Sequence, residues 1–135
     1  MILFDRQFKI LLEDIKILVT NANNQEALDK VNYSLKQYSL KNLMPDDYIV
    51  STFNTYINVL YGDKIMNKDE SFFINLKESD VISDEYEKEN NESITFLISV
   101  FRDIWNGLDN NTKDKIWKRM QILVKLCQKW KKERK

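Results

Sequence analysis

Glycine and proline are almost absent from this chain, and that scarcity restricts its fold more than any other sequence feature. The 135 residues include two glycines, Gly62 and Gly107, and one proline, Pro45. β-Turns and hairpins repeatedly use glycine for a positive φ and proline for a fixed φ. The sequence therefore argues against an all-β fold, and its length fits one domain.

Apolar residues recur at intervals of three and four along much of the chain, which places them on single faces of α-helices. The pattern predicts helices over about residues 5–20, 25–39, 45–61 and 93–108, and a last helix whose apolar face runs from Ile116 to Trp130. Asn24 is the expected N-cap of the second helix. Pro45 is expected in the first turn of the third helix, and Gly62 at its end.

These helices predict an all-α fold, a single-domain bundle of five or six helices over residues 1–135. About four residues separate the last two helices, so we expect a C-terminal antiparallel helical hairpin. Before this hairpin, residues 78–92 hold seven acidic residues and one lysine, a local net charge of −6. We expect residues 77–92 to form an acidic mobile loop.

The chain has no histidine and a single cysteine, Cys127. The first fact excludes histidine acid–base and nucleophile systems, and the second excludes an internal disulfide or a multi-thiolate zinc site. Two isolated glycines cannot build a phosphate-binding loop, and adjacent carboxylates such as Asp46 and Asp47 diverge on a helix. We therefore expect no enzymatic activity, no cofactor and no metal, and we expect Cys127 to be a small buried apolar residue.

Charge is balanced overall but unevenly distributed. Lys plus Arg and Asp plus Glu each number 21, yet residues 113–135 contain ten basic and two acidic residues, a local net charge of +8. Such a basic end can neutralise nucleic-acid phosphates, be a solvated helix terminus, or dock onto an acidic partner or the acidic loop of this chain. The candidate nucleic-acid-binding residues, which include a basic tail over residues 131–135, are Lys125, Lys129, Lys131, Lys132, Arg134 and Lys135.

Aromatic residues mark a second kind of candidate site. Trp105 and Trp117 lie on apolar helical stripes and are expected in the core, whereas Trp130 lies past the last clear turn of its stripe. Tryptophan is enriched at binding hot spots, so Trp130 is a candidate contact anchor. The candidate partner-binding residues, which add the segment before the acidic loop, are Lys68, Asp69, Glu70, Phe72, Phe73 and Trp130.

Several short motifs occur in a distinctive order. They are Phe8-x-x-Leu11-x-Glu13-Asp14-Ile15, a proline that opens the third helix, Asp63-Lys64-Ile65-x-Asn67-Lys68-Asp69-Glu70-x-Phe72-Phe73, an acidic spacer, and Ile104-Trp105-x-x-Leu108-x-x-x-x-Lys113-x-x-Ile116-Trp117. Together they resemble a group of small, largely uncharacterised helical proteins of giant nucleocytoplasmic large DNA viruses, of the mimivirus and phycodnavirus kind. The resemblance covers most of the chain. It implies a viral protein that acts inside the host cell, and it carries no catalytic residue.

We expect a non-enzymatic helical binding module that recognises a viral or host protein partner or associates with itself as a homodimer. The alternative is an accessory factor that contacts DNA or RNA through the basic end. Charged residues interrupt every apolar stretch well before the roughly 20 residues that a membrane span needs, so no membrane contact is expected. No small-molecule substrate is expected. The expected location is the host cytoplasm or the virion, both reducing.

Overall fold

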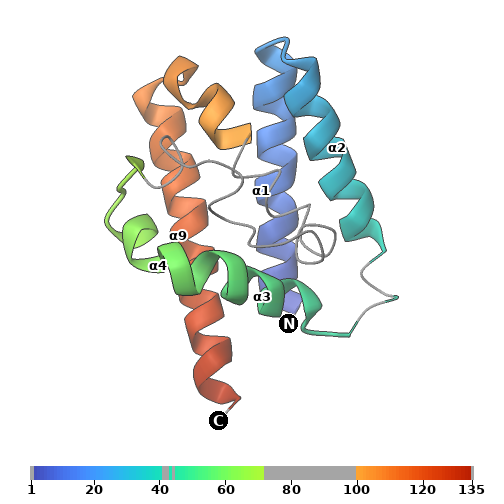
Figure 1. Cartoon of the computed structure of the whole chain (residues 1–135), viewed down its shortest axis with the longest axis vertical. Helices are drawn as coiled ribbons and strands as arrows, with labels where there is room; N and C mark the ends of the chain where they lie inside the picture. Colours follow the sequence, from blue (N-terminus) through green and yellow to red (C-terminus); the bar gives the residue numbers. More distant parts are fainter. Residues whose placement is uncertain (1, 41–42, 44, 72–99, 135) are drawn as a thin grey trace.

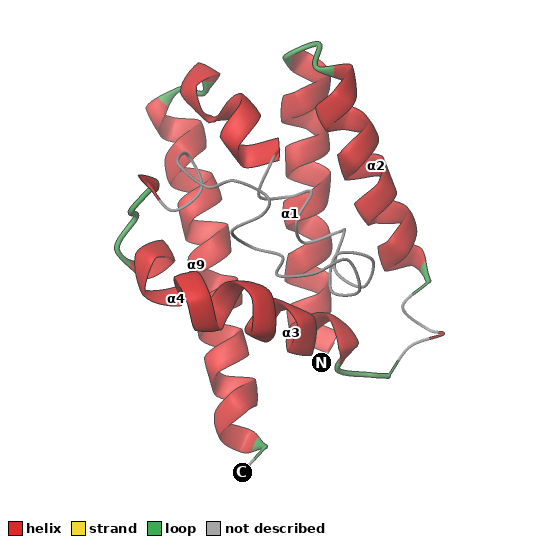
Figure 2. Ribbon diagram, in the orientation of Figure 1, coloured by secondary structure: helices red, strands yellow, loops and turns green. Residues whose placement is uncertain are grey.

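The computed structural model describes residues 2–40, 43, 45–71 and 100–134, and every regular element among them is helical (Figure 2). This confirms the predicted all-α fold. Residues 100–104 are helical as well. The elements in chain order are α1 (Ile2–Asn21), α2 (Gln25–Ser39), α3 (Tyr48–Phe53), the π-helical segment η2 (Asn54–Asn58), α4 (Val59–Met66), the short 3-10 helix η3 (Trp105–Gly107) and α9 (Asn110–Glu133). The predicted acidic loop, residues 77–92, lies outside the described residues.

The described bundle consists of the long helices α1, α2 and α9, the crossing run α3–η2–α4 and the short helical stretch at residues 100–107 (Figure 1). α1 and α2 form an antiparallel hairpin, and α9 contacts α1 on the side away from α2. The continuous run α3–η2–α4 crosses α1 and α9 and contacts both. The last turns of α9 extend beyond this crossing helix toward the C-terminus.

Aromatic contacts join the inner faces of these helices. Phe4 of α1 is fully buried, and its ring packs edge-on against Phe53 of α3 at 5.2 Å between centroids. Trp105 packs edge-on against Trp117 of α9 at 5.3 Å, and both are buried. The prediction that these two tryptophans belong to the core is confirmed.

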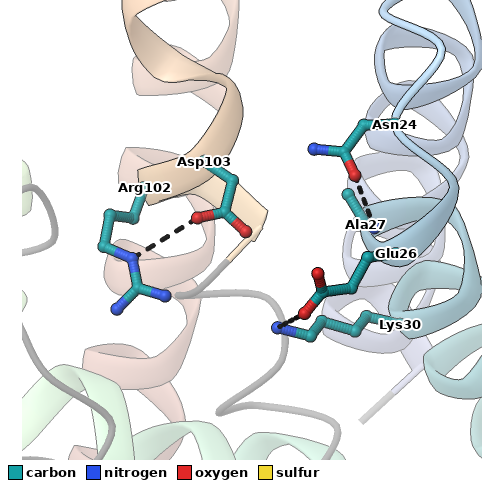
Figure 3. Close-up of polar contacts among 6 residues, drawn as sticks. All are labelled: Asn24, Glu26, Ala27, Lys30, Arg102 and Asp103. Atoms are coloured by element: carbon teal, nitrogen blue, oxygen red, sulfur yellow. Dashed lines mark hydrogen bonds and ion pairs between the residues drawn. The ribbon is translucent and has the colours of Figure 1, made fainter.

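The turn between α1 and α2 follows from its asparagines. Asn23 adopts a left-handed φ of 56°, which asparagine tolerates better than most residues. Its amide donates to the Thr20 carbonyl at 3.2 Å and the Asn24 amide donates to the Val19 carbonyl at 3.3 Å, the pair of bonds of a Schellman motif. The Asn24 side chain then accepts the Ala27 amide at 3.0 Å (Figure 3), so the predicted N-cap is confirmed.

Figure 3 also shows two ion pairs, each between residues that are close in sequence. Lys30 Nζ lies 3.8 Å from Glu26 Oε1 within α2, and Arg102 Nε lies 3.5 Å from Asp103 Oδ1. At least one partner of each pair is a third or more exposed, so each contributes about 0–1 kcal/mol to stability.

The third helix differs from its prediction at both ends. It begins at Tyr48, and Pro45 lies before it, in a turn closed by the Tyr48 amide and the Pro45 carbonyl at 3.0 Å. Asp47 immediately precedes the helix, but its carboxylate binds Arg134 and makes no cap hydrogen bond. The helix then runs through η2 and α4 to Met66, so the prediction that Gly62 ends it was wrong.

Close approach of a side chain explains why position 62 is glycine. A Cβ atom on Gly62 would lie 2.7 Å from Asn58 Oδ1, closer than real Cβ contacts. Asn58 Nδ2 donates to Asn54 Oδ1 at 2.9 Å, which fixes the Asn58 side chain along the π-helical segment. Asn58 Oδ1 is buried and has no hydrogen-bond partner among the described residues. Gly62 therefore makes room for Asn58 within a continuous helix.

We expect strong coupling between Gly62 and Asn58. Replacing glycine by alanine within a helix ordinarily raises the free energy of unfolding by about 1 kcal/mol. Gly62→Ala, however, must displace the Asn58 side chain and break its hydrogen bond to Asn54, which lowers the free energy of unfolding by about 1 kcal/mol or more. In an Asn58→Ala background the same change should recover the helix-propensity gain. Urea unfolding of the double-mutant cycle should give a coupling energy of about 1–2 kcal/mol, and additive effects would contradict the account.

Candidate nucleic-acid interface

The longest helix, α9, begins at a fixed position because of its N-cap. Asp109 accepts the Thr112 amide at 2.7 Å, and this hydrogen bond is the main cause that lowers the pKa of Asp109. From this cap the helix continues without interruption for 24 residues. A helix of that length measures about 36 Å at 1.5 Å per residue.

Contacts on three sides fix the rotation of α9 about its axis. Its buried face consists of six side chains, namely Ile116, Trp117, Met120, Leu123, Val124 and Cys127. On one flank Arg119 donates to Gln7 Oε1 of α1. On the other, Gln121 Nε2 donates to the carbonyls of Ile65 and Met66 at 3.3 and 3.2 Å, at the end of α4. The remaining side of α9 must therefore face solvent.

That outer side carries a row of lysines, which we call the lysine face. At 3.6 residues per turn its members fall within an arc of about 100° and extend over about 26 Å of helix. All are exposed. Ile122, also exposed, lies among them. The lysine face consists of Lys115, Lys118, Lys125, Lys129 and Lys132.

None of the described residues forms an ion pair with the lysines of this face. The nearest compensation is at the start of α9, where the charge of Lys115 contributes to the lowered pKa of Asp109. α9 contains two acidic residues, Asp114 and Glu133. Asp114 is already bound to Lys68, with Nζ 3.8 Å from Oδ1. Glu133 lies in the last turn, at the far end of the row.

The structure divides the basic residues that the sequence grouped together. Lys125, Lys129 and Lys132 belong to the lysine face, whereas Arg134 binds the Asp47 carboxylate, with its guanidinium 4.9 Å from the Trp130 ring centroid. Lys131 is exposed in the last turn of α9, which continues to Glu133, so the predicted basic tail begins within the helix. Lys135 lies outside the described residues.

Cys127 lies on the buried face of α9, which confirms its predicted place as a small core residue. Burial raises the pKa of the Cys127 thiol to about 11, against a smaller opposing effect of the Lys131 charge. The thiol is therefore protonated at neutral pH. A protonated, buried thiol is a poor nucleophile and a poor metal ligand.

The first three predicted partner-binding residues make contacts within the chain. Lys68 has a left-handed φ of 55° and pairs with Asp114. Asp69 accepts the Ser71 amide at 3.1 Å and its hydroxyl at 2.6 Å, and these bonds lower the pKa of Asp69. Glu70 accepts the indole N–H of Trp105. The contacts of Lys68 and Glu70 therefore tie the residues after α4 to α9 and η3, whereas those of Asp69 stay within its own segment.

Trp130 is half-buried against the core, and the Arg134 guanidinium lies over its ring. It lies 16 positions after Asp114 along α9, or about 24 Å at 1.5 Å per residue. The structure therefore does not bring Trp130 and Lys68 into one site. Phe72 and Phe73 lie outside the described residues, and contact of this set with a protein partner stays a prediction.

Sequence reasoning did not single out Lys115, Lys118 and Ile122 as members of the interface. Their signal was present as helical periodicity, because Lys118, Lys125 and Lys132 are spaced seven residues apart and so share one face. The two flank contacts of α9, Arg119 with Gln7 and Gln121 with α4, had no local signal. Only the fold shows that this face is left open.

No family model, curated protein or solved structure matches the chain. The relationship to giant-virus proteins therefore stays a prediction. In the described parts of the chain, no helix is long and apolar enough to span a membrane. Nor do the described residues bring three His, Cys, Asp or Glu side chains into a group that could hold a metal ion.

Proposed function

We propose that the protein is a non-enzymatic nucleic-acid-binding module whose lysine face neutralises backbone phosphates. The observation that carries this proposal is the row of five exposed lysines on α9, none of which forms an ion pair with a described acidic residue. A regular array of positive charge about 26 Å long can meet several phosphates at once. The other side of the same helix is occupied by the core, so it is not available for binding.

Repulsion between neighbouring lysines of this face destabilises α9. Lys115 with Lys118, Lys125 with Lys129 and Lys129 with Lys132 are spaced three or four residues apart, and such pairs destabilise a helix by about 0.2–0.5 kcal/mol each. In the absence of a ligand, the helix dipole offsets this repulsion only in the last turn, at Lys132. A polyanion would remove the repulsion, so binding should also stabilise α9.

Lysine at every basic position of the face favours phosphate contact over base reading. The lysine ammonium is a flexible point charge, whereas base recognition in the major groove is most often made by the planar, bidentate guanidinium of arginine. Arg119 and Arg134 point elsewhere, to Gln7 and Asp47. We therefore infer binding with little dependence on base sequence.

The expected result is steeply salt-dependent binding of a labelled duplex, measured by fluorescence anisotropy. Five neutralised phosphates give a slope of log K against log salt of about −4.5. The triple variant Lys118→Gln, Lys125→Gln, Lys129→Gln should reduce that slope to about −2 and weaken binding at 50 mM salt by about tenfold or more. Duplexes of unrelated sequence should bind within about threefold of each other.

The matched control removes three exposed lysines from other helices, Lys16, Lys36 and Lys64. Its overall charge equals that of the first variant, so it should retain the wild-type slope. Equal loss of binding in both variants would indicate a response to net charge and would contradict a lysine-face site. Absence of any anisotropy change at low salt would reject nucleic-acid binding.

The proposal also includes the compartment in which the protein acts. The resemblance to giant-virus proteins and a lone buried cysteine support a reducing compartment, the host cytoplasm or the virion. Viral or host DNA or RNA would then be the polyanion. Recognition of a protein partner through Phe72, Phe73 and Trp130 is the alternative, and affinity capture that depends on these three side chains would support it.

A further inference from the structure

A second surface, on α1, is apolar and faces away from the core. Leu3 is 48% exposed and Ile17 is 60% exposed, and Ile10 between them is half-buried without belonging to the core cluster. The three are spaced seven residues apart, so they form one ridge about 21 Å long on the outer side of α1. Single exposed aliphatic residues are ordinary, whereas three at heptad spacing form one continuous line that a second helix can cover.

Charged residues beside the ridge are arranged for pairing with a copy of the same helix. Arg6 and Glu13 lie on one flank and Asp14 lies on the other, by their positions in the helical repeat. None of the three forms an ion pair with a described residue. Their charges are therefore available to a partner.

We infer that the protein forms a two-fold symmetric dimer in which the α1 helices of two copies pack antiparallel about Ile10. In this register Leu3 of each copy faces Ile17 of the second copy, and the Ile10 side chains meet at the axis. The two-fold axis of an antiparallel pair places the same flank of each helix side by side. Arg6 therefore lies beside Glu13 of the second copy, and this pair occurs twice per dimer. Parallel packing would instead place Glu13 beside Asp14 of the second copy, which is repulsive.

Sedimentation velocity over a protein concentration range up to about 500 µM tests the dimer, because an interface of this small size is expected at the weak, micromolar end of the affinity range. Wild type should change from monomer to dimer as concentration rises. Ile10→Glu should weaken dimerisation by at least about tenfold, since it places two carboxylates at the axis. Ile122→Glu, the same change at an exposed isoleucine of α9, should leave dimerisation unchanged.

A charge exchange tests the register. Arg6→Glu should weaken the dimer, and Arg6→Glu combined with Glu13→Arg should restore it, because the pair is then reversed on both copies. Circular dichroism of each variant checks that α1 remains folded. A monomer at every concentration would overturn the inference, and so would failure of the reversed pair to restore a dimer that Arg6→Glu had disrupted.

Cross-linking gives an independent reading of helix direction. Leu3→Cys mixed with Ile17→Cys should form a disulfide-linked dimer, whereas each variant alone should not. The native Cys127 is buried, so wild type provides the unlinked control. Cross-linking of Leu3→Cys to itself would show parallel packing and overturn the antiparallel register.

Discussion

Replacement of Trp105 by alanine is expected to lower the free energy of unfolding by about 3–5 kcal/mol. The indole is fully buried, packs edge-on against Trp117 and has Lys113 Nζ 5.4 Å from its ring centroid. Its N–H donates to Glu70, which would lose this donor. Since a domain is stable by about 5–15 kcal/mol in total, the variant should be close to unfolding.

Urea unfolding followed by circular dichroism measures this loss, with Trp130→Ala as the control. Trp130 is half-buried and lies at the end of α9, so its removal should cost clearly less than that of Trp105. Trp105→Phe should fall between the two, because it keeps an aromatic ring and loses the bond to Glu70. Equal losses of stability at positions 105 and 130 would contradict the burial of Trp105 in the core.

Replacement of Phe4 by alanine is expected to destabilise the protein by a similar amount, about 3–5 kcal/mol. Phe4 is fully buried, stacks on Phe8 at 6.3 Å and meets Phe53 edge-on at 5.2 Å. The last contact joins α1 to α3, so the cavity would open where the crossing helix meets the bundle. Differential scanning calorimetry should show a large fall in Tm.

Leu3→Ala is the neighbouring control for Phe4. Leu3 is one residue away on the same turn but points outward, so its truncation should change the stability of the monomer by about 0.5 kcal/mol or less. Both variants should be measured at dilute concentration, where dimerisation contributes little. A Leu3 effect as large as that of Phe4 would contradict the assigned rotation of α1.

Local signals were sufficient for much of the fold. Asn24 was predicted as an N-cap because its side chain needs only the amide of Ala27, three residues away, to satisfy the helix end. The buried residues of α1 and α9 followed from apolar spacing, since that spacing alone decides which side of a helix can leave water. Trp105 and Trp117 were placed in the core for the same reason.

The third helix shows where local reasoning fails. Gly62 has the residue type of a helix end, yet its small size serves a contact with Asn58 one turn earlier, across a π-helical segment that sequence spacing did not indicate. Asp47 has the residue type of a cap, but its carboxylate binds Arg134, 87 positions later in the chain. A side-chain contact one turn away decided the first outcome, and a long-range contact decided the second.

The candidate site was predictable in composition and not in geometry. The excess of lysine near the C-terminus was evident, but the sequence grouped Arg134 with Lys125 although Asp47 and Trp130 hold Arg134 away from the lysine face. Which face of α9 stays open depends on Gln7 of α1 and on the end of α4. These partners are remote in sequence, so no periodicity could identify them.

The most direct test of the central claim is an NMR titration that observes the lysine side chains themselves. With a short duplex at low salt, the side-chain methylene signals of Lys115, Lys118, Lys125, Lys129 and Lys132 should shift and return at high salt. Signals of Lys16 and Lys36, on α1 and α2, should stay in place. Shifts spread evenly over all lysines, or none on α9, would contradict a nucleic-acid site on this helix.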